Sequence, residues 1–191
     1  MPVVETATVY EDGPRAGERG RLYVNIEGVT HDPFASFGYL VFDPQSAENG
    51  LRTGERIYGI EIEMTHAPSR FSTSGEVEVW LVASPMLFTS DMRFDRNALP
   101  NGIGNQLGRL IPLVGPAQYD DGMVSGGRFL WKFSVTESSI SHIARTIAQG
   151  NMIHFAITPV GDSVAATFAG TDWLARDTRI SGAPKLTLIV K

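Results

Sequence analysis

The sequence predicts an all-β fold, a jelly-roll-like antiparallel β-sandwich of about ten strands with one short connecting helix. Two observations lead to this prediction. Apolar and polar residues alternate with a period of two through most of the chain, which is typical of strands with one buried face. Glycine and proline interrupt these runs at the spacing expected of a sandwich. One stretch alone shows a convincing helical period.

That stretch lies between two strands near the middle of the C-terminal half. Phe129, Trp131 and Phe133 alternate with mostly polar neighbours. This period of two predicts a strand with one face in the core. Residues 136–139 have the composition of a helix cap, and apolar residues then recur at helical spacing, which predicts a helix over residues 138–149. Period two returns over residues 153–157. We expect the apolar helix face, Ile140, Ile143 and Ile147, to cover an open end of the sandwich.

The remaining strands follow from the same alternation and from the turns that bound them. Residues 37–42 are apolar on both sides, which indicates a strand covered on both faces. Trp80 is expected on the less apolar face of its strand. The Glu11-Asp12-Gly13-Pro14 segment predicts a turn. The expected strands outside the central stretch are residues 3–10, 22–26, 37–42, 58–65, 76–83, 109–114, 164–168 and 185–190.

Length and charge restrict the classes of protein to consider. The 191 residues fit one domain, residues 1–191. A net charge of -5 without a basic stripe argues against binding of nucleic acid. The apolar runs are shorter than a membrane helix requires, so we expect no membrane insertion. The absence of cysteine excludes disulfides and thiolate zinc sites.

Four segments carry a family resemblance: residues 39–43 (YLVFD), 133–136 (FSVT), 153–157 (IHFAI) and 183–190 (APKLTLIV). In this order they resemble the DNRLRE family of secreted β-sandwich modules. The resemblance implies a jelly-roll-like module of a larger exported protein, with carbohydrate binding in some members and a structural role in others. It also implies an extracellular or cell-surface location, as a mature fragment without its signal.

The candidate ligand site consists of loop residues, because strand side chains are committed to the core or to a solvated face. Aromatic rings stack on sugar rings, and neighbouring charged groups orient the ligand. We therefore expect polysaccharide, or another surface component, to bind on one rim of the sandwich. A competing interpretation places Trp173 as a loop residue packed over the sandwich edge. The candidate residues are Trp173, Asp172, Arg176, Tyr119 and Asp121.

Metal binding rests on weaker signals, and no cofactor is predicted with certainty. Aspartates in irregular segments are potential ligands of a structural calcium ion, although turn formation is the better explanation of them. These are Asp12, Asp120, Asp121, Asp162, Asp172 and Asp177. The four histidines lack the spacing of a zinc site.

No catalytic signature is present, so the leading hypothesis is a noncatalytic, polysaccharide-binding module. One alternative is a structural, self-assembling jelly-roll subunit of a shell, surface layer or adhesion scaffold, and the oligomeric state stays open. Another is a polysaccharide-degrading enzyme that uses Glu61, Glu63 or a histidine. The weakly patterned residues 84–127 are expected to be functional or mobile.

Overall fold

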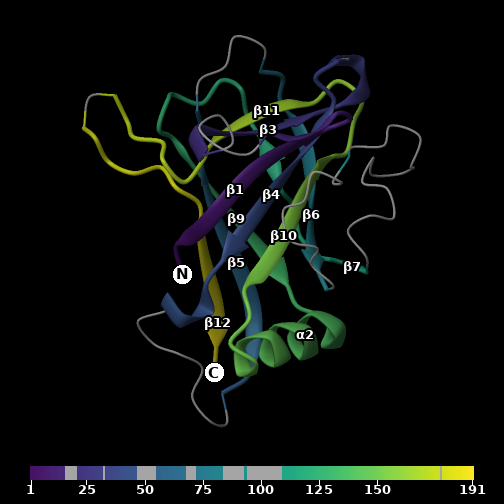
Figure 1. Cartoon of the computed structure of the whole chain (residues 1–191), viewed down its shortest axis with the longest axis vertical. Helices are drawn as coiled ribbons and strands as arrows, with labels where there is room; N and C mark the ends of the chain where they lie inside the picture. The colour runs from purple at the N-terminus through teal and green to yellow at the C-terminus, as the bar shows by residue number, and fades with distance from the viewer. Residues whose placement is uncertain are drawn as a thin grey trace.

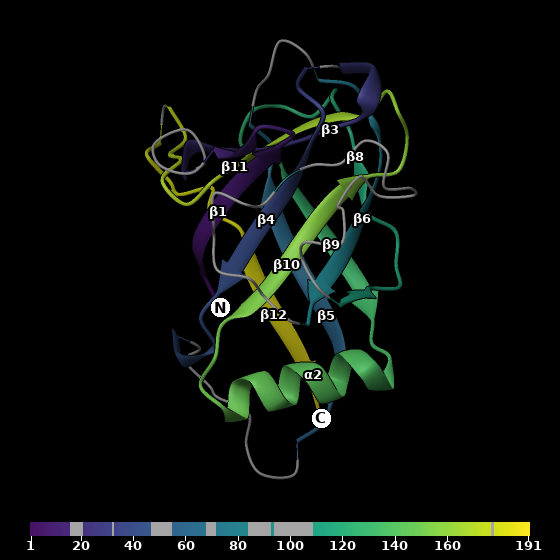
Figure 2. The ribbon, with the colours of Figure 1, turned by 45° about the vertical axis from the view of Figure 1, so that its right-hand side comes forward.

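Twelve strands and one α-helix of twelve residues make up the regular structure that we describe in this computed structural model, together with two short 3-10 turns. The description covers residues 1–15, 21–31, 33–46, 55–67, 72–83, 93, 109–176 and 178–191. The strands form two antiparallel layers, as Figures 1 and 2 show. The predicted all-β sandwich is therefore confirmed.

The larger layer is built around β4 (Ser36–Phe42) and β10 (Ile153–Pro159). β1 (Val3–Tyr10) pairs with the free side of β4, and β6 (Gly75–Val82) pairs with β10. Three short strands extend the edges: β2 (Gly13–Arg15) on β1, and β7 (Leu110–Pro112) and β8 (Gln118–Tyr119) on β6. A bulge between Val3 and Glu5 shifts the register of β1.

The smaller layer has the order β12-β5-β9. β5 (Ile57–Thr65) lies between β12 (Lys185–Val190) and β9 (Arg128–Ser134). Ile60, Ile62 and Met64 of β5 point into the core, whereas Glu61 and Glu63 face outward beside cationic residues of the neighbouring strands.

One strand pair links the two layers at the end opposite the helix. β3 (Tyr23–Glu27) pairs along its whole length with β11 (Ala165–Ala169) but meets β4 only at Glu27 and Ser36. β11 in turn reaches the end of β5, where His66 bridges Phe168. In Figure 1 this pair lies across the top of the molecule. The pair thereby covers that end of the core.

The core between the layers is predominantly aliphatic and aromatic. Trp131 is 4% exposed, and its indole N–H donates a hydrogen bond to the carbonyl oxygen of Gln118 at 3.1 Å. Its ring meets the Phe168 ring edge to face at a centroid distance of 5.4 Å. The prediction that Trp131 belongs to the core is confirmed.

A second apolar cluster lies on the outer face of the larger layer and includes Phe37, Tyr39 and Val41 of β4. Every residue of β4 is buried, which confirms the expectation of a strand covered on both faces. Trp80 contacts this outer cluster, away from the inward-facing Val77, Val79 and Leu81, as expected, and its indole N–H donates to the Thr158 hydroxyl.

The helix α2 (Glu137–Ala148) lies across the other end of the sandwich (Figure 2). Thr136 is its N-cap and exchanges capping hydrogen bonds with Ser139. Ile143 is buried, and Ile140 and Ile147 pack against the core. The predicted helix and its apolar face are confirmed, and no other helix longer than two turns occurs among the residues described.

Several observed strand ends differ from the predicted ones by one or two residues, and the turn predicted over Glu11-Asp12-Gly13-Pro14 is confined to its first two residues. Gly13 and Pro14 do not end a strand but form β2, because the chain turns at Glu11-Asp12 and folds back onto β1. Gly13 has a φ of 119°, which glycine tolerates. Pro14 has no backbone N–H to donate, and an edge strand tolerates this because one of its sides has no neighbouring strand. The third strand begins at Tyr23, not Leu22. Within residues 84–127, residues 84–92 and 94–108 lie outside the description.

Trp131→Ala is expected to lower the free energy of unfolding by about 3–5 kcal/mol, because it removes a buried ring and leaves a cavity. Leu130→Ala is the matched control on the same strand, since Leu130 is 51% exposed and should change stability by less than about 1 kcal/mol. Denaturant melts measure both values. Equal losses for the two variants would contradict the central position of Trp131.

Stability should fall as the pH drops through the titration of His154. Burial, followed by the charge of His142, lowers the pKa of His154 to about 4, from the ordinary 6.5 that the unfolded chain retains. The native state then binds fewer protons, so the stability present above pH 6.5 is lost progressively down to about pH 4. His154→Gln should flatten this part of the melting-temperature profile. An NMR titration of His154 with a midpoint at or above 6.5 would contradict the argument.

Candidate functional site

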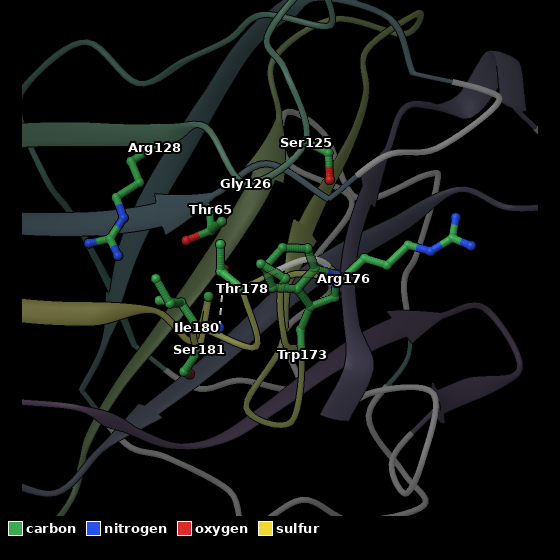
Figure 3. Close-up of a pocket in the computed structure, with 11 residues that line it drawn as sticks. Thr65, Ser125, Gly126, Arg128, Trp173, Arg176, Thr178, Ile180 and Ser181 are labelled. Carbon is green, nitrogen blue, oxygen red and sulfur yellow. Dashed lines mark hydrogen bonds between the residues drawn. The ribbon is translucent and has the colours of Figure 1, made fainter.

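An open cleft of about 420 Å³ lies on the rim of the sandwich at the end opposite α2. Three segments form it: the ends of β5 and β9, the loop between β8 and β9, and the loop between β11 and β12 (Figure 3). Its lining residues are Thr65, Ser125, Gly126, Arg128, Trp173, Ala175, Arg176, Thr178, Ile180, Ser181 and Gly182. Two of the five predicted site residues, Trp173 and Arg176, are among them.

Trp173 is the fixed wall of this cleft. It is 7% exposed and packs with Ala67 and Ala169. Gly182 lies directly against its ring, because a Cβ atom at position 182 would come within 2.4 Å of Trp173 Cε3. The interpretation that Trp173 packs over the sandwich edge is therefore confirmed. Only a small part of its surface is available to a ligand.

The segment after Trp173 folds back on itself as a short hairpin. The amide of Gly182 donates to the carbonyl of Trp173, and Leu174 bridges Ser181. Arg179 adopts a positive φ of 55° at the turn, and its amide donates to the carbonyl of Ala175. Ile180 is 58% exposed beside the cleft. The hairpin thus presents an apolar side chain and two hydroxyls, Thr178 and Ser181, next to the indole.

On the sheet side of the cleft, an ion pair restrains the guanidinium of Arg128. Arg128 pairs with Glu63, and Lys185 shares the same carboxylate at 3.6 Å. Thr65 stands directly opposite Arg128 in the β5–β9 pairing. The charge of Arg128 is partly neutralised, but its side chain remains exposed at the cleft wall.

The other charged candidates lie at the margin. Arg176 is exposed, and Figure 3 shows its guanidinium extending away from Thr65 and Ser181. Asp172 does not line the cleft and instead forms an exposed ion pair with Arg21 at 3.3 Å. Such a pair contributes little to stability. The pair can nevertheless hold the start of the loop between β11 and β12 in place, because the Asp172 amide also donates a hydrogen bond to the Arg21 carbonyl.

The expectation that Tyr119 offers a free ring is wrong. Tyr119 is 2% exposed, its ring contacts His66, Phe129 and Phe168, and its hydroxyl donates to Ser72. The physical reason is β8: pairing with β6 turns this side chain inward, although its sequence neighbours Asp120 and Asp121 are polar. Burial also raises the pKa of the Tyr119 hydroxyl. Its neighbour Asp121 is exposed, accepts a hydrogen bond from the Ser74 hydroxyl and does not line the cleft.

The loop aspartates show no metal-like grouping. Asp120 accepts a hydrogen bond from the Gly122 amide, and Asp121 is held by Ser74. Among the residues described, no three His, Cys, Asp or Glu side chains come close enough to hold a metal ion. Asp177, one of the aspartates proposed from the sequence, lies outside the description.

His66 is an unusual group near this rim. It is 4% exposed, and its Nδ1 atom has no hydrogen-bond partner among the residues that the structure describes. Burial lowers its pKa, against the opposing charges of Asp120 and Asp121. In the sequence, the signal for its burial is its place directly after the half-buried strand that ends at Thr65. The hydroxyl residues Thr65, Ser125, Thr178 and Ser181 were missed, because scattered hydroxyls have no sequence pattern. Arg128 and Ile180 were missed as well, since only the fold brings them to the same rim.

The carboxylates proposed for a glycosidase do not line the cleft, although Glu63 contacts its wall through Arg128. Glu61 pairs with Lys132 at 3.0 Å and Glu63 with Arg128, all on the outer face of the smaller layer. The simpler interpretation, a charged strand face with cross-strand ion pairs, accounts for both residues. The cleft is lined by hydroxyl groups, apolar side chains and two arginines. Among the residues described, its lining contains no carboxylate.

No family model matches the chain, and no curated protein is significantly similar to it. The resemblance to DNRLRE modules therefore stays a prediction.

Gly182→Ala should displace Trp173, because the added methyl group would overlap Trp173 Cε3. We expect a loss of about 1–3 kcal/mol in the free energy of unfolding and a changed tryptophan emission spectrum. Gly161→Ala is the control, since its Cβ would meet Val164 at an ordinary 3.6 Å. Identical spectra and stabilities for the two variants would show that position 182 does not hold the indole.

Proposed function

We propose that this protein is a noncatalytic extracellular or cell-surface β-sandwich module that binds polysaccharide in the rim cleft. The observation that carries the proposal is the convergence of Trp173, the Thr178 to Ser181 hairpin and Arg128 around one hollow of about 420 Å³. A hollow of this size fits a short run of sugar units.

The lining suits a polyhydroxylated ligand. Hydroxyl groups of Thr65, Ser125, Thr178 and Ser181 can donate and accept hydrogen bonds with sugar hydroxyls. Ile180 and the exposed edge of Trp173 offer apolar contact to the faces of sugar rings. Arg128 supplies a positioned donor at one end, because its ion pair with Glu63 restrains it.

The composition of the cleft supports the noncatalytic part of the proposal. Glycoside hydrolysis by the usual route needs two carboxyl groups that flank the bond to be cut. The cleft residues described include two arginines and several hydroxyls but no acid or imidazole. This argues for recognition of an intact chain.

The proposed location rests on the predicted resemblance to secreted modules. No helix in the described portion of the chain is long and apolar enough to span a membrane. The β-sandwich, whose two sheets leave loops clustered on one rim, is a common scaffold for binding sites on loops.

The proposal is tested by obstructing the cleft. A glycan array of neutral and acidic polysaccharides is expected to retain the wild-type protein, and calorimetry with the strongest ligand then measures affinity. Ser125→Phe should weaken that affinity by at least about tenfold, because a large side chain would enter the cleft from an exposed loop position.

Thr187→Phe is the matched control. Thr187 is exposed on β12 of the same layer but does not line the cleft, so the same substitution there should leave affinity unchanged. Retention of no polysaccharide by wild type would overturn the function. Equal affinity in wild type and Ser125→Phe would overturn the location.

A further inference from the structure

A second hollow, of about 520 Å³, lies beside α2 at the opposite end of the sandwich from the rim cleft. α2 contributes His142, Arg145 and Thr146, and its C-cap residue Gln149 extends this wall. Asn151 and Met152 after the helix and Ala83 after β6 complete the hollow. Figure 2 shows α2 crossing below the ends of β10 and β6. No part of this hollow is shared with the rim cleft.

The three helical residues and the C-cap Gln149 form one polar stripe. Positions 142, 145, 146 and 149 follow the i, i+3, i+4, i+7 spacing that places side chains on one helix face. The apolar face, with Ile143 at its centre, is fixed against the core. Because the helix cannot rotate without exposing Ile143, the polar stripe is held toward the hollow.

The charge of this hollow is positive. Arg145 lines it, and Arg109 lies near enough to His142 for its charge to act there. Burial first, then Arg145 and Arg109, lower the pKa of His142. Within the described parts of the chain neither arginine forms a salt bridge, and no acidic side chain lines the hollow. These cationic groups stand out against a net charge of -5.

The neutral groups of the hollow add hydrogen-bond donors. The Gln149 side-chain oxygen accepts a bond from the Asn151 amide group at 3.2 Å, which leaves the Gln149 amide hydrogens available. Thr146 Oγ1 and His142 Nε2 are 3.3 Å apart, so each orients the other. Donors thus come from the helix, from its end and from the following turn.

We propose that this hollow binds a tetrahedral oxyanion, a phosphate or sulfate group carried by a small molecule or a sugar. Arg145 supplies the principal charge, and Gln149, Asn151 and Thr146 supply hydrogen bonds to the anion oxygens. Such anions accept several bonds from different directions, and arginine recognises them well. The hollow is larger than the bare anion, which leaves space for the group that carries it. This proposal does not depend on polysaccharide binding at the rim.

The test uses inorganic phosphate and inorganic sulfate as probes for the full chain. An NMR titration should show saturable shifts of His142 and of the Gln149 and Asn151 side-chain amides, together with a raised pKa of His142. Glycerol 3-phosphate against glycerol then tests whether a carried phosphate binds and its neutral carrier does not. Phosphate binding without sulfate binding, or the reverse, identifies which of the two anions the site takes.

Arg145→Gln should weaken anion binding by at least about tenfold, since it removes the charge but keeps a helix-forming side chain. Arg179→Gln is the control, because Arg179 is exposed in the distant hairpin and should have no effect. Gln149→Glu, at an exposed position, should also weaken binding, and melting curves verify that each variant is folded.

Two results would overturn the proposal. One is the absence of saturable shifts with both phosphate and sulfate. The other is equal weakening by Arg145→Gln and Arg179→Gln, which would indicate attraction by overall charge and not a site.

Discussion

The Phe168 ring is the contact on which the rest of the sandwich depends. It meets the rings of Tyr119, Phe129 and Trp131 edge to face, at centroid distances of 5.3, 5.7 and 5.4 Å. Edge-to-face geometry places the positive edge of one ring on the negative face of another and favours each pair beyond simple burial. These rings come from β11, β8 and β9, so one side chain joins strands of both layers. The aromatic packing therefore holds the β3–β11 pair over the end of the core.

The rim cleft is a consequence of that arrangement. Once β11 is fixed against the end of β5, the chain that follows it must pass over the rim before β12 begins. Trp173 anchors this passage against Ala67 and Ala169, and Gly182 allows the returning chain to lie against the indole. The loop between β8 and β9 meets the same ring through Gly126. A rigid scaffold thus places two loops around one hollow, which is how binding sites commonly arise on β-sandwiches.

Much of this fold was accessible from the sequence because it depends on local periodicity. Alternation predicted β5, β9 and β10, and the helical spacing of Ile140, Ile143 and Ile147 predicted the face of α2. The failures were at positions where tertiary pairing overrides local character. Tyr119 directly precedes two aspartates, yet β8 pairs with β6 and turns it inward. Ser125 and Ser181 line the same cleft only because the fold brings their loops together. Their spacing along the chain does not predict this.

The position of β4, buried on both faces, determines when this chain can complete its fold. Its partner on one side, β1, precedes it closely, but its partner on the other side, β10, follows only after β5, β6, β9 and α2. During synthesis β4 therefore leaves the ribosome with an apolar, unpaired edge that nothing local can cover. Folding that waits for such distant pairings is slow, and an open strand edge invites association with other chains. For this protein the hazardous period of biogenesis ends when residues 153–159 become available to close the sheet.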